Sequence, residues 1–135
     1  MAYEESIRSI TLTSDNTLAV RTGVSNAPGS PADNAGNQYR FVTIKGEHLA
    51  GRAGTGDVVV GVLQNKPQVP SEAATVAIRG VSKVRVEGAV TAGTAVDVGA
   101  DGRGVAAGVD VDGVGIALAT ATEADELIPV LLRLG

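Results

Sequence analysis

Cysteine is absent from this 135-residue chain, and histidine and aromatic residues are scarce. Without cysteine, neither a disulfide framework nor a thiolate metal site can form. One histidine, two tyrosines and one phenylalanine leave little that could stack on bases or sugar rings. The net charge of −4 and the dispersed basic residues argue against a nucleic-acid partner, because phosphate-binding surfaces need clustered lysine and arginine.

Long apolar runs are also missing. No run approaches the about 18 residues that span a bilayer, so we expect no membrane partner. The segment from Met1 to Ile10 lacks a basic region followed by an apolar one, so we expect no signal peptide. The length is that of a single domain, which is large enough to bury its own core.

What the chain has instead is glycine and valine. Its 18 glycines require many tight turns, and short Val-rich runs are separated by Gly, Ala, Asp and Thr, above all after Gly56. This pattern predicts an all-β fold with a small β-barrel or sandwich-like body. The segments expected as strands are residues 7–13, 18–24, 39–44, 58–63, 74–79, 81–87, 90–98 (with a turn at 92–93), 114–119 and 128–134.

Three features inside these runs carry specific expectations. The apolar run Val58–Leu63 predicts a strand buried on both faces, and Gly61 within it predicts a bulge or a close backbone approach. Charged residues alternate along Val81–Glu87, which predicts one solvated face or an ion-paired seam. The Asp-Gly pairs at 101–102 and 112–113 predict two hairpins, the first with a type I′ turn.

The N-terminal segment, from Met1 to Gln38, differs in texture from the rest. Ser25–Gln38 consists almost throughout of Pro, Gly, Asn, Asp and Ser without an apolar period, which predicts a loop or an extended arm. A structureless stretch of this length is typical of functional or partner-ordered segments, and plain disorder is the alternative. We therefore divide the chain into an extended N-terminal arm and loop, residues 1–38, and a β-rich body, residues 39–135.

No residue pattern points to catalysis, a cofactor or a metal. His48 has no nearby partner for such a role and is interpreted as a surface residue in a polar turn. Gly51–Gly56 lacks the Gly-Lys-Ser/Thr ending of a phosphate loop and leads into a strand, so turn geometry explains it better. Asp110 and Asp112 begin a calcium-loop pattern without its downstream ligands, which favours a solvated hairpin tip. We expect a non-enzymatic protein with no catalytic, cofactor-binding or metal-binding residue and no small-molecule substrate.

A weak internal echo joins the two halves of the chain. Ala53-Gly54-Thr55 leads to Gly61-Val62-Leu63, and Ala92-Gly93-Thr94 leads to Gly115-Ile116-Ala117-Leu118. Two loosely matched units are too few for a solenoid, which needs three or more regular repeats. We interpret the echo as a duplicated strand–turn–strand unit in a small barrel.

From Tyr39 onward, the order of short motifs resembles that of the small capsid decoration proteins of tailed bacteriophages, also called cement or head-stabilising proteins. The motifs are GVLQNKP at 61–67, VAIRGV at 76–81, VTAGTAV at 90–96, DGR at 101–103, GIAL at 115–118 and PVLL at 129–132. The resemblance covers residues 39–135, and the segment before Tyr39 takes no part in it.

The resemblance implies a non-enzymatic protein with a small β-barrel-like body that assembles as a homotrimer. Such a protein sits on the outside of an icosahedral head, at three-fold and quasi-three-fold positions, and clamps neighbouring subunits against internal pressure. The implied partner is the major capsid protein. The implied location is the capsid exterior of the virion, after synthesis in the host cytoplasm.

The resemblance supplies no contact residues, so the candidates come from the chain itself. Ile7, Ile10 and Leu12 are the apolar members of the N-terminal segment, which we expect to pair with an exposed strand edge of the capsid. Tyr39 and Phe41 share one face of an expected strand, which predicts a core layer or an interface. We expect these five residues to contact the capsid.

The Gly/Val texture also fits a β-rich interaction or carrier module of another kind, such as a biotinyl-like or clip-like domain. A carrier needs a lysine at a hairpin tip. Lys83 lies within a strand pattern, and Lys45 and Lys66 lack the Met-Lys context of biotinyl domains. A third alternative is an enzyme whose site is assembled from distant acidic residues and His48.

Overall fold

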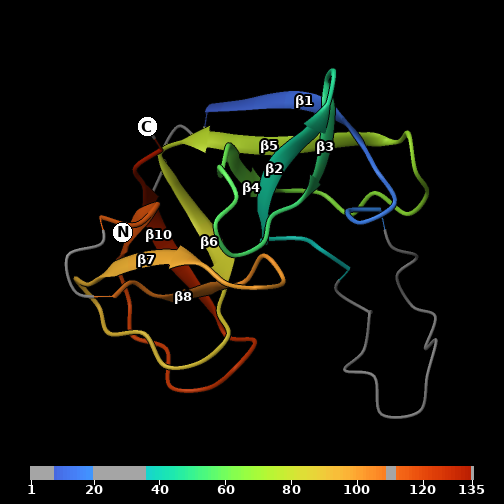
Figure 1. The fold of residues 1–135 in the computed structure, drawn as a ribbon. Coiled ribbons are helices and arrows are strands. Elements are labelled where there is room, and N and C mark those ends of the chain that lie inside the picture. Colours follow the sequence, from blue (N-terminus) through green and yellow to red (C-terminus); the bar gives the residue numbers. More distant parts are fainter. Residues whose placement is uncertain (1–7, 20–35, 109–111, 135) are drawn as a thin grey trace, which may run out of the picture.

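The computed structural model describes residues 8–19, 36–108 and 112–134. Every regular element in these residues is a β-strand, and the described part of the chain has no helix suited to crossing a membrane. The ten strands form two groups of five, drawn in blue and green and in yellow to red in Figure 1. The all-β fold expected from the sequence is confirmed.

The first group closes on itself and is called the first barrel. Around it the strand order is β1-β3-β2-β4-β5, and β5 pairs with β1 to complete the ring. Only the contact between β1 and β3 is parallel. The strands are β1 Arg8–Ser14, β2 Phe41–Gly46, β3 Leu49–Arg52, β4 Gly61–Leu63 and β5 Ala73–Arg79.

The second group is called the second sheet, with strand order β6-β10-β9-β7-β8. It curls until its outer strands meet, because Val86, which follows β6, forms a parallel bridge with Gly104 of β8. Gly80, with a φ of 98°, joins the two groups by turning the chain from β5 into β6. The strands are β6 Val81–Arg85, β7 Ala95–Val98, β8 Gly104–Ala106, β9 Gly115–Ala117 and β10 Leu127–Leu132.

The two groups have the same topology. Followed around the ring from its first strand, the second sheet reads β6-β8-β7-β9-β10, which reproduces β1-β3-β2-β4-β5 of the first barrel. In both groups the contact between the first and the third strand is parallel and the others are antiparallel. The chain is therefore an internal duplication of one five-stranded unit.

Strand register identifies the equivalent residues. Val42 pairs with Gly61 in the first barrel, and Val96 pairs with Gly115 in the second sheet. The pairs between β4 and β5 and those between β9 and β10 keep the same spacing. From β2 to β5, each residue therefore has its equivalent 54 positions later in the sequence, as Val42 has in Val96.

The first strands of the two units are 72 positions apart, because Ser14 pairs with Ala50 where Val86 pairs with Gly104. The difference lies in the next connection, which spans 15–40 in the first unit and only 87–94 in the second. The first unit thus carries an insertion between its first and second strands.

Local hydrogen bonding is duplicated as well. Glu72 Oε2 accepts a hydrogen bond from the backbone N–H of Gln68 at 3.0 Å, and Glu126 Oε2 accepts one from Thr122 at 3.1 Å. Few equivalent positions hold the same residue, so the sequence shows the duplication only faintly. The identical pairs are Val42/Val96, Ala53/Ala107, Gly54/Gly108, Val60/Val114, Gly61/Gly115, Glu72/Glu126, Val76/Val130 and Arg79/Arg133.

Alternation along the strands of the first barrel gives it two apolar faces. The inner face forms one buried cluster of Leu18, Val42, Ala50, Leu63, Ala74 and Val76. Phe41, Val62 and Ala77 point the other way and belong to a second cluster, shared with the core of the second sheet. Burial on both faces is confirmed for β4, but residues 58–60 lie outside this strand and Val58 is 79% exposed, so the strand expected over 58–63 was too long. A Cβ on Gly61 would meet the Ala77 carbonyl oxygen, which confirms the expected close approach.

The expected boundary at Gln38 differs from the observed architecture. β1 lies inside the expected arm, yet it is a barrel strand between β3 and β5. Asn37 also belongs to the folded body, because its Nδ2 donates to the backbone oxygen of Leu18 at 2.8 Å. Residues 1–7 and 20–35, which include most of the expected loop and of the expected strand at 18–24, lie outside the described residues.

Of the two expected hairpins, one is confirmed. β7 pairs with β8 across Asp101-Gly102, but only Gly102 has a positive φ, and a type I′ turn needs two. The hairpin at Asp112-Gly113 is wrong, because β8 and β9, on either side of it, pair with β7 and not with each other. The echo was also partly misaligned, since Ala53-Gly54 corresponds to Ala107-Gly108.

Candidate interaction surface

The outer side of the second sheet exposes a band of large apolar side chains. Leu118, Leu127 and Leu131 are 48%, 41% and 42% exposed. Leu131 of the central strand β10 lies between Ile116 of β9 and Val81 of β6. Contiguous exposed apolar side chains of this kind mark surfaces that bind another protein.

The edge of this band is basic. Lys83 pairs across the strands with Pro129, and Arg85 pairs with Leu127. The Nζ atom of Lys83 lies over the Tyr39 ring, 6.0 Å from its centre, as in a cation–π contact. The alternation expected for residues 81–87 is confirmed, since the residues between the charged ones are buried.

A network of ion pairs ties the first barrel to the second sheet. Arg40 Nη1 lies 3.3 Å from Asp101 Oδ2 and donates to the Asp101 backbone oxygen at 3.0 Å. Arg103 Nε lies 3.0 Å from Asp101 Oδ2, and Arg103 Nη1 lies 3.0 Å from Asp125 Oδ1. Each of these carboxylates is paired with a guanidinium group. We therefore interpret the network as structural, holding the first barrel and the second sheet together.

The electrostatics of the network follow from its position at the junction. Burial lowers the pKa of Arg40, and nearby guanidinium groups add to this effect against the opposing charge of Asp101. Burial alone would raise the pKa of Asp101, but its hydrogen bonds from Arg103 and the charge of Arg40 outweigh burial and lower that pKa. The Asp101 hydrogen bond raises the pKa of Arg103.

Because the pKa of Asp101 is lowered, its contribution to stability should be present above the ordinary value of 3.8 and lost as pH falls through the folded value. We expect Asp101→Asn to cost about 1 kcal/mol at neutral pH, a small effect because the side chain is partly exposed. The difference from wild type should shrink toward zero below about pH 3.8. Urea unfolding at several pH values measures it.

The matched control is Asp57→Asn. Asp57 lies 3.8 Å from Lys45 and both side chains are well exposed, so this pair contributes little. A stability loss for Asp101→Asn that is the same at neutral and acid pH would contradict the role given to its charge.

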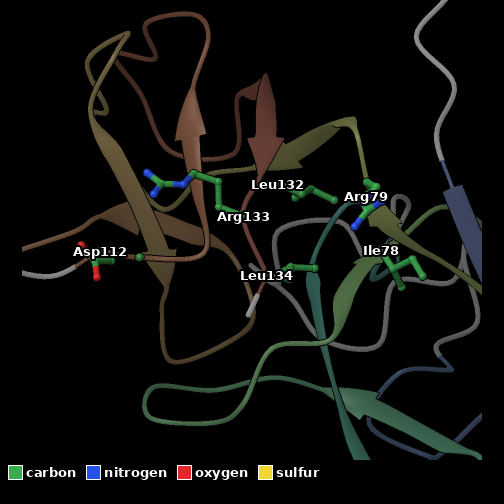
Figure 2. Close-up of a pocket in the computed structure, with 7 residues that line it drawn as sticks. Ile78, Arg79, Asp112, Leu132, Arg133 and Leu134 are labelled. Atoms are coloured by element: carbon green, nitrogen blue, oxygen red, sulfur yellow. The ribbon is translucent and has the colours of Figure 1, made fainter.

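A hollow of about 640 Å³ lies between the ends of β5 and β10. In Figure 2, Leu132 and Leu134 lie between Ile78 and Arg79 on one side and Asp112 on the other. Arg79 and Arg133 are equivalent residues of the two units. The lining of the hollow carries Arg79, Arg133 and Asp112, and among the described residues it includes no cluster of carboxylates.

The described residues also contain no group of three or more His, Cys, Asp or Glu that could hold a metal. His48 lies exposed in the turn between β2 and β3, with a φ of 54°, as expected of a turn residue. Gly51 and Arg52 of the supposed phosphate loop are part of β3, and the chain continues into β4.

The five residues expected to contact a capsid have different surroundings. Phe41 is fully buried in the core shared by the two units, so its assignment as a contact residue is wrong. Tyr39 and Leu12 are half-buried and pack against the two cores. Ile10 is 40% exposed, and Ile7 lies outside the described residues.

The exposed leucines of the second sheet were not identified from the sequence. Residues 127–132 are an uninterrupted apolar run, which is typical of a strand buried on both faces. Only the position of β10, with its outer side uncovered, distinguishes the exposed Leu127 and Leu131 from the buried Val130.

Comparison with protein-family models and with curated proteins finds no match. Among solved structures, the chain is similar to the N base of the head fibre protein gp8.5 of bacteriophage phi29, with a TM-score of 0.63. The chain shares the fold of a phage head-fibre base. The similarity covers 95% of each chain at 14% sequence identity, so both five-stranded units fall within the shared fold.

Proposed function

We propose that this protein is a non-enzymatic decoration protein on the exterior of an icosahedral phage head. The observation that carries the proposal is the fold likeness to a head-fibre base over almost the whole of both chains. The motif order from Tyr39 onward supports it independently, because it resembles that of capsid decoration proteins. Both point to a structural protein of the phage head.

In this proposal the partner is the major capsid protein, and the protein stabilises the head by bridging neighbouring capsid subunits. It acts as a homotrimer, made in the host cytoplasm. Exposed apolar side chains supply contact area, at roughly 25 cal/mol per Å² of apolar surface before the cost of association is subtracted. Three linked copies on a symmetric site add avidity.

The test is co-sedimentation with expanded, undecorated phage heads. We expect the purified protein to pellet with the heads at a saturating, fixed copy number per head. We also expect the decorated heads to release their DNA at a higher temperature than bare heads, because ligands that bind the assembled state stabilise it. Heads already carrying their own decoration protein are the control, since their sites are occupied.

Protein that remains in the supernatant at saturating head concentration would contradict the proposal. An intact mass above that of the unmodified chain, isolated from producing cells, would instead favour the carrier alternative, in which a lysine is modified. Co-sedimentation and the intact mass are both measured on the same purified protein.

A further inference from the structure

The junction inside the chain uses the outer face of the first barrel. Phe41, Val62 and Ala77 lie side by side on three neighbouring strands and have no exposed surface. They pack against the second sheet in the shared core. One face of the five-stranded unit is thus built to cover part of another unit.

The second sheet receives this face between β6 and the tip of the β7–β8 hairpin. On β6, Ser82 Oγ accepts a hydrogen bond from Gln64 Nε2 at 2.8 Å. At the hairpin tip, the Gly102 backbone oxygen accepts one from the Phe41 N–H at 2.7 Å. The junction therefore joins two different surfaces of the unit, a donor face and a receiving face.

The duplication leaves one donor face uncovered. Moving 54 positions along the chain from Phe41, Val62 and Ala77 leads to Ala95, Ile116 and Leu131. These equivalents also lie side by side; Leu131 is 42% exposed, and Ala95 and Ile116 are half-buried. The second sheet thus presents, without a partner among the described residues, the face that its counterpart buries.

The duplication also leaves one receiving face uncovered. Ser82 and Val98 of the second sheet are 2% and 5% exposed. Their equivalents in the first barrel, Ile10 and Ile44, are 40% and 46% exposed. Large apolar side chains therefore stand exposed at the two positions where the second sheet is covered.

One pair of residues that meets across the junction, Gln64 and Ser82, changes its chemistry together in the equivalent positions. Inside the chain, the polar Gln64 of the donor face meets the polar Ser82 of the receiving face. Their uncovered equivalents are Leu118 and Ile10, which are both apolar and both exposed. Each pair has complementary chemistry, which is expected if Leu118 and Ile10 also meet across an interface.

We propose that a second copy of this chain docks head to tail, with its first barrel on the outer face of the second sheet. In this interface Leu118 and Leu131 of one copy pack against Ile10 and Ile44 of the next. The contact joins unlike surfaces, so it propagates until a ring closes. The inference rests on the proposed function in one respect, because a ring of three chains is the homotrimer proposed above.

The experiment uses the absence of cysteine in the chain. Ile10→Cys and Leu118→Cys are made singly, and equal amounts of the two proteins are mixed and treated with a short bismaleimide reagent. We expect a covalent dimer from the mixture and little from either protein alone. The matched control replaces Ile10→Cys by Val69→Cys, because Val69 is 48% exposed and lies outside both faces.

Light scattering of the protein without introduced cysteines gives the second measurement. Leu131→Asp is expected to lower the mass from that of an oligomer to the 13.5 kDa of one chain, while Val69→Asp leaves the oligomer intact. Leu131 is partly exposed, so its variant should still fold, with the circular-dichroism spectrum of the wild type. A mixture that gives no more dimer than the Val69→Cys control, or an oligomer that survives Leu131→Asp, overturns the inference.

Co-sedimentation with heads separates this inference from the proposed function. Wild-type protein that binds heads but gives no specific cross-link would contradict the head-to-tail interface alone. Protein that cross-links as expected but never binds heads would contradict the decoration function and leave the interface standing.

Discussion

Phe41→Ala is expected to lower the free energy of unfolding by about 3–5 kcal/mol, the range for truncating a buried phenylalanine. Phe41 is the only phenylalanine of the chain and is fully buried. It packs between the first barrel and the second sheet, where most neighbours are small aliphatic side chains that cannot refill the space. Domains of this size are typically stable by about 5–15 kcal/mol, so the loss would be a large share of the total.

Urea unfolding followed by circular dichroism measures this effect, since the chain has no tryptophan to serve as a fluorescent probe. The midpoint should fall with little change in slope, because both proteins expose similar surface on unfolding. Phe41→Leu keeps an apolar side chain in the cavity and should lose much less. A loss below about 1.5 kcal/mol for Phe41→Ala would show that the two units do not depend on this contact.

Gly61→Ala and Gly115→Ala are each expected to destabilise the protein by about 3 kcal/mol, because the added methyl group would clash with atoms of the neighbouring strand. At Gly61 a Cβ would lie 2.5 Å from Val76 Cγ1 and against the Ala77 carbonyl oxygen. At Gly115 it would lie 2.5 Å from Val130 Cγ1 and 2.8 Å from the Leu131 oxygen. The two glycines are equivalents, and they meet equivalent atoms on the neighbouring strand.

Gly88→Ala is the matched control, because a Cβ at Gly88 meets no atom within 4 Å. Its effect should stay within about 0.5 kcal/mol of wild type. Thermal unfolding of the three variants ranks them directly. If Gly61→Ala and Gly115→Ala unfolded at the same temperature as Gly88→Ala, the close approach of the strands at both glycines would be refuted.

The sequence predicts strands best where the pattern has one clear cause. Alternation along Val81–Glu87 requires a sheet with one buried face, and β6 has it. Gly61 interrupts an apolar run, and the neighbouring strand does approach it closely. These patterns lie within one strand, so they can be interpreted without knowing which strands pair with it.

Pairing between distant strands is where prediction fails. Asp112-Gly113 has the composition of a hairpin turn, yet the next strand pairs on the far side of β7. The pattern around Phe41 predicts a core layer or an interface equally well, and the choice depends on what covers the outer face of the barrel. No local pattern carries that information.

The duplication was visible only as an echo for a related reason. Buried positions require an apolar side chain of suitable size, and Phe41 and Ala95 can occupy equivalent sites in different surroundings. Identity is required only where geometry allows a single residue, as at Gly61 and Gly115. The candidate surface could not be predicted for the same reason. Its exposed leucines stand out only when they are compared with the equivalent residues of the first barrel.

The unequal connections of the two units have a practical consequence. The second unit passes from its first strand to its second through 87–94 alone, so ring closure does not require a connection as long as 15–40. The length of this connection is therefore free to vary between Ala19 and Gly36, where the described body leaves and rejoins it. A peptide inserted between Ala19 and Gly36 should therefore leave the strand order of the first barrel unchanged.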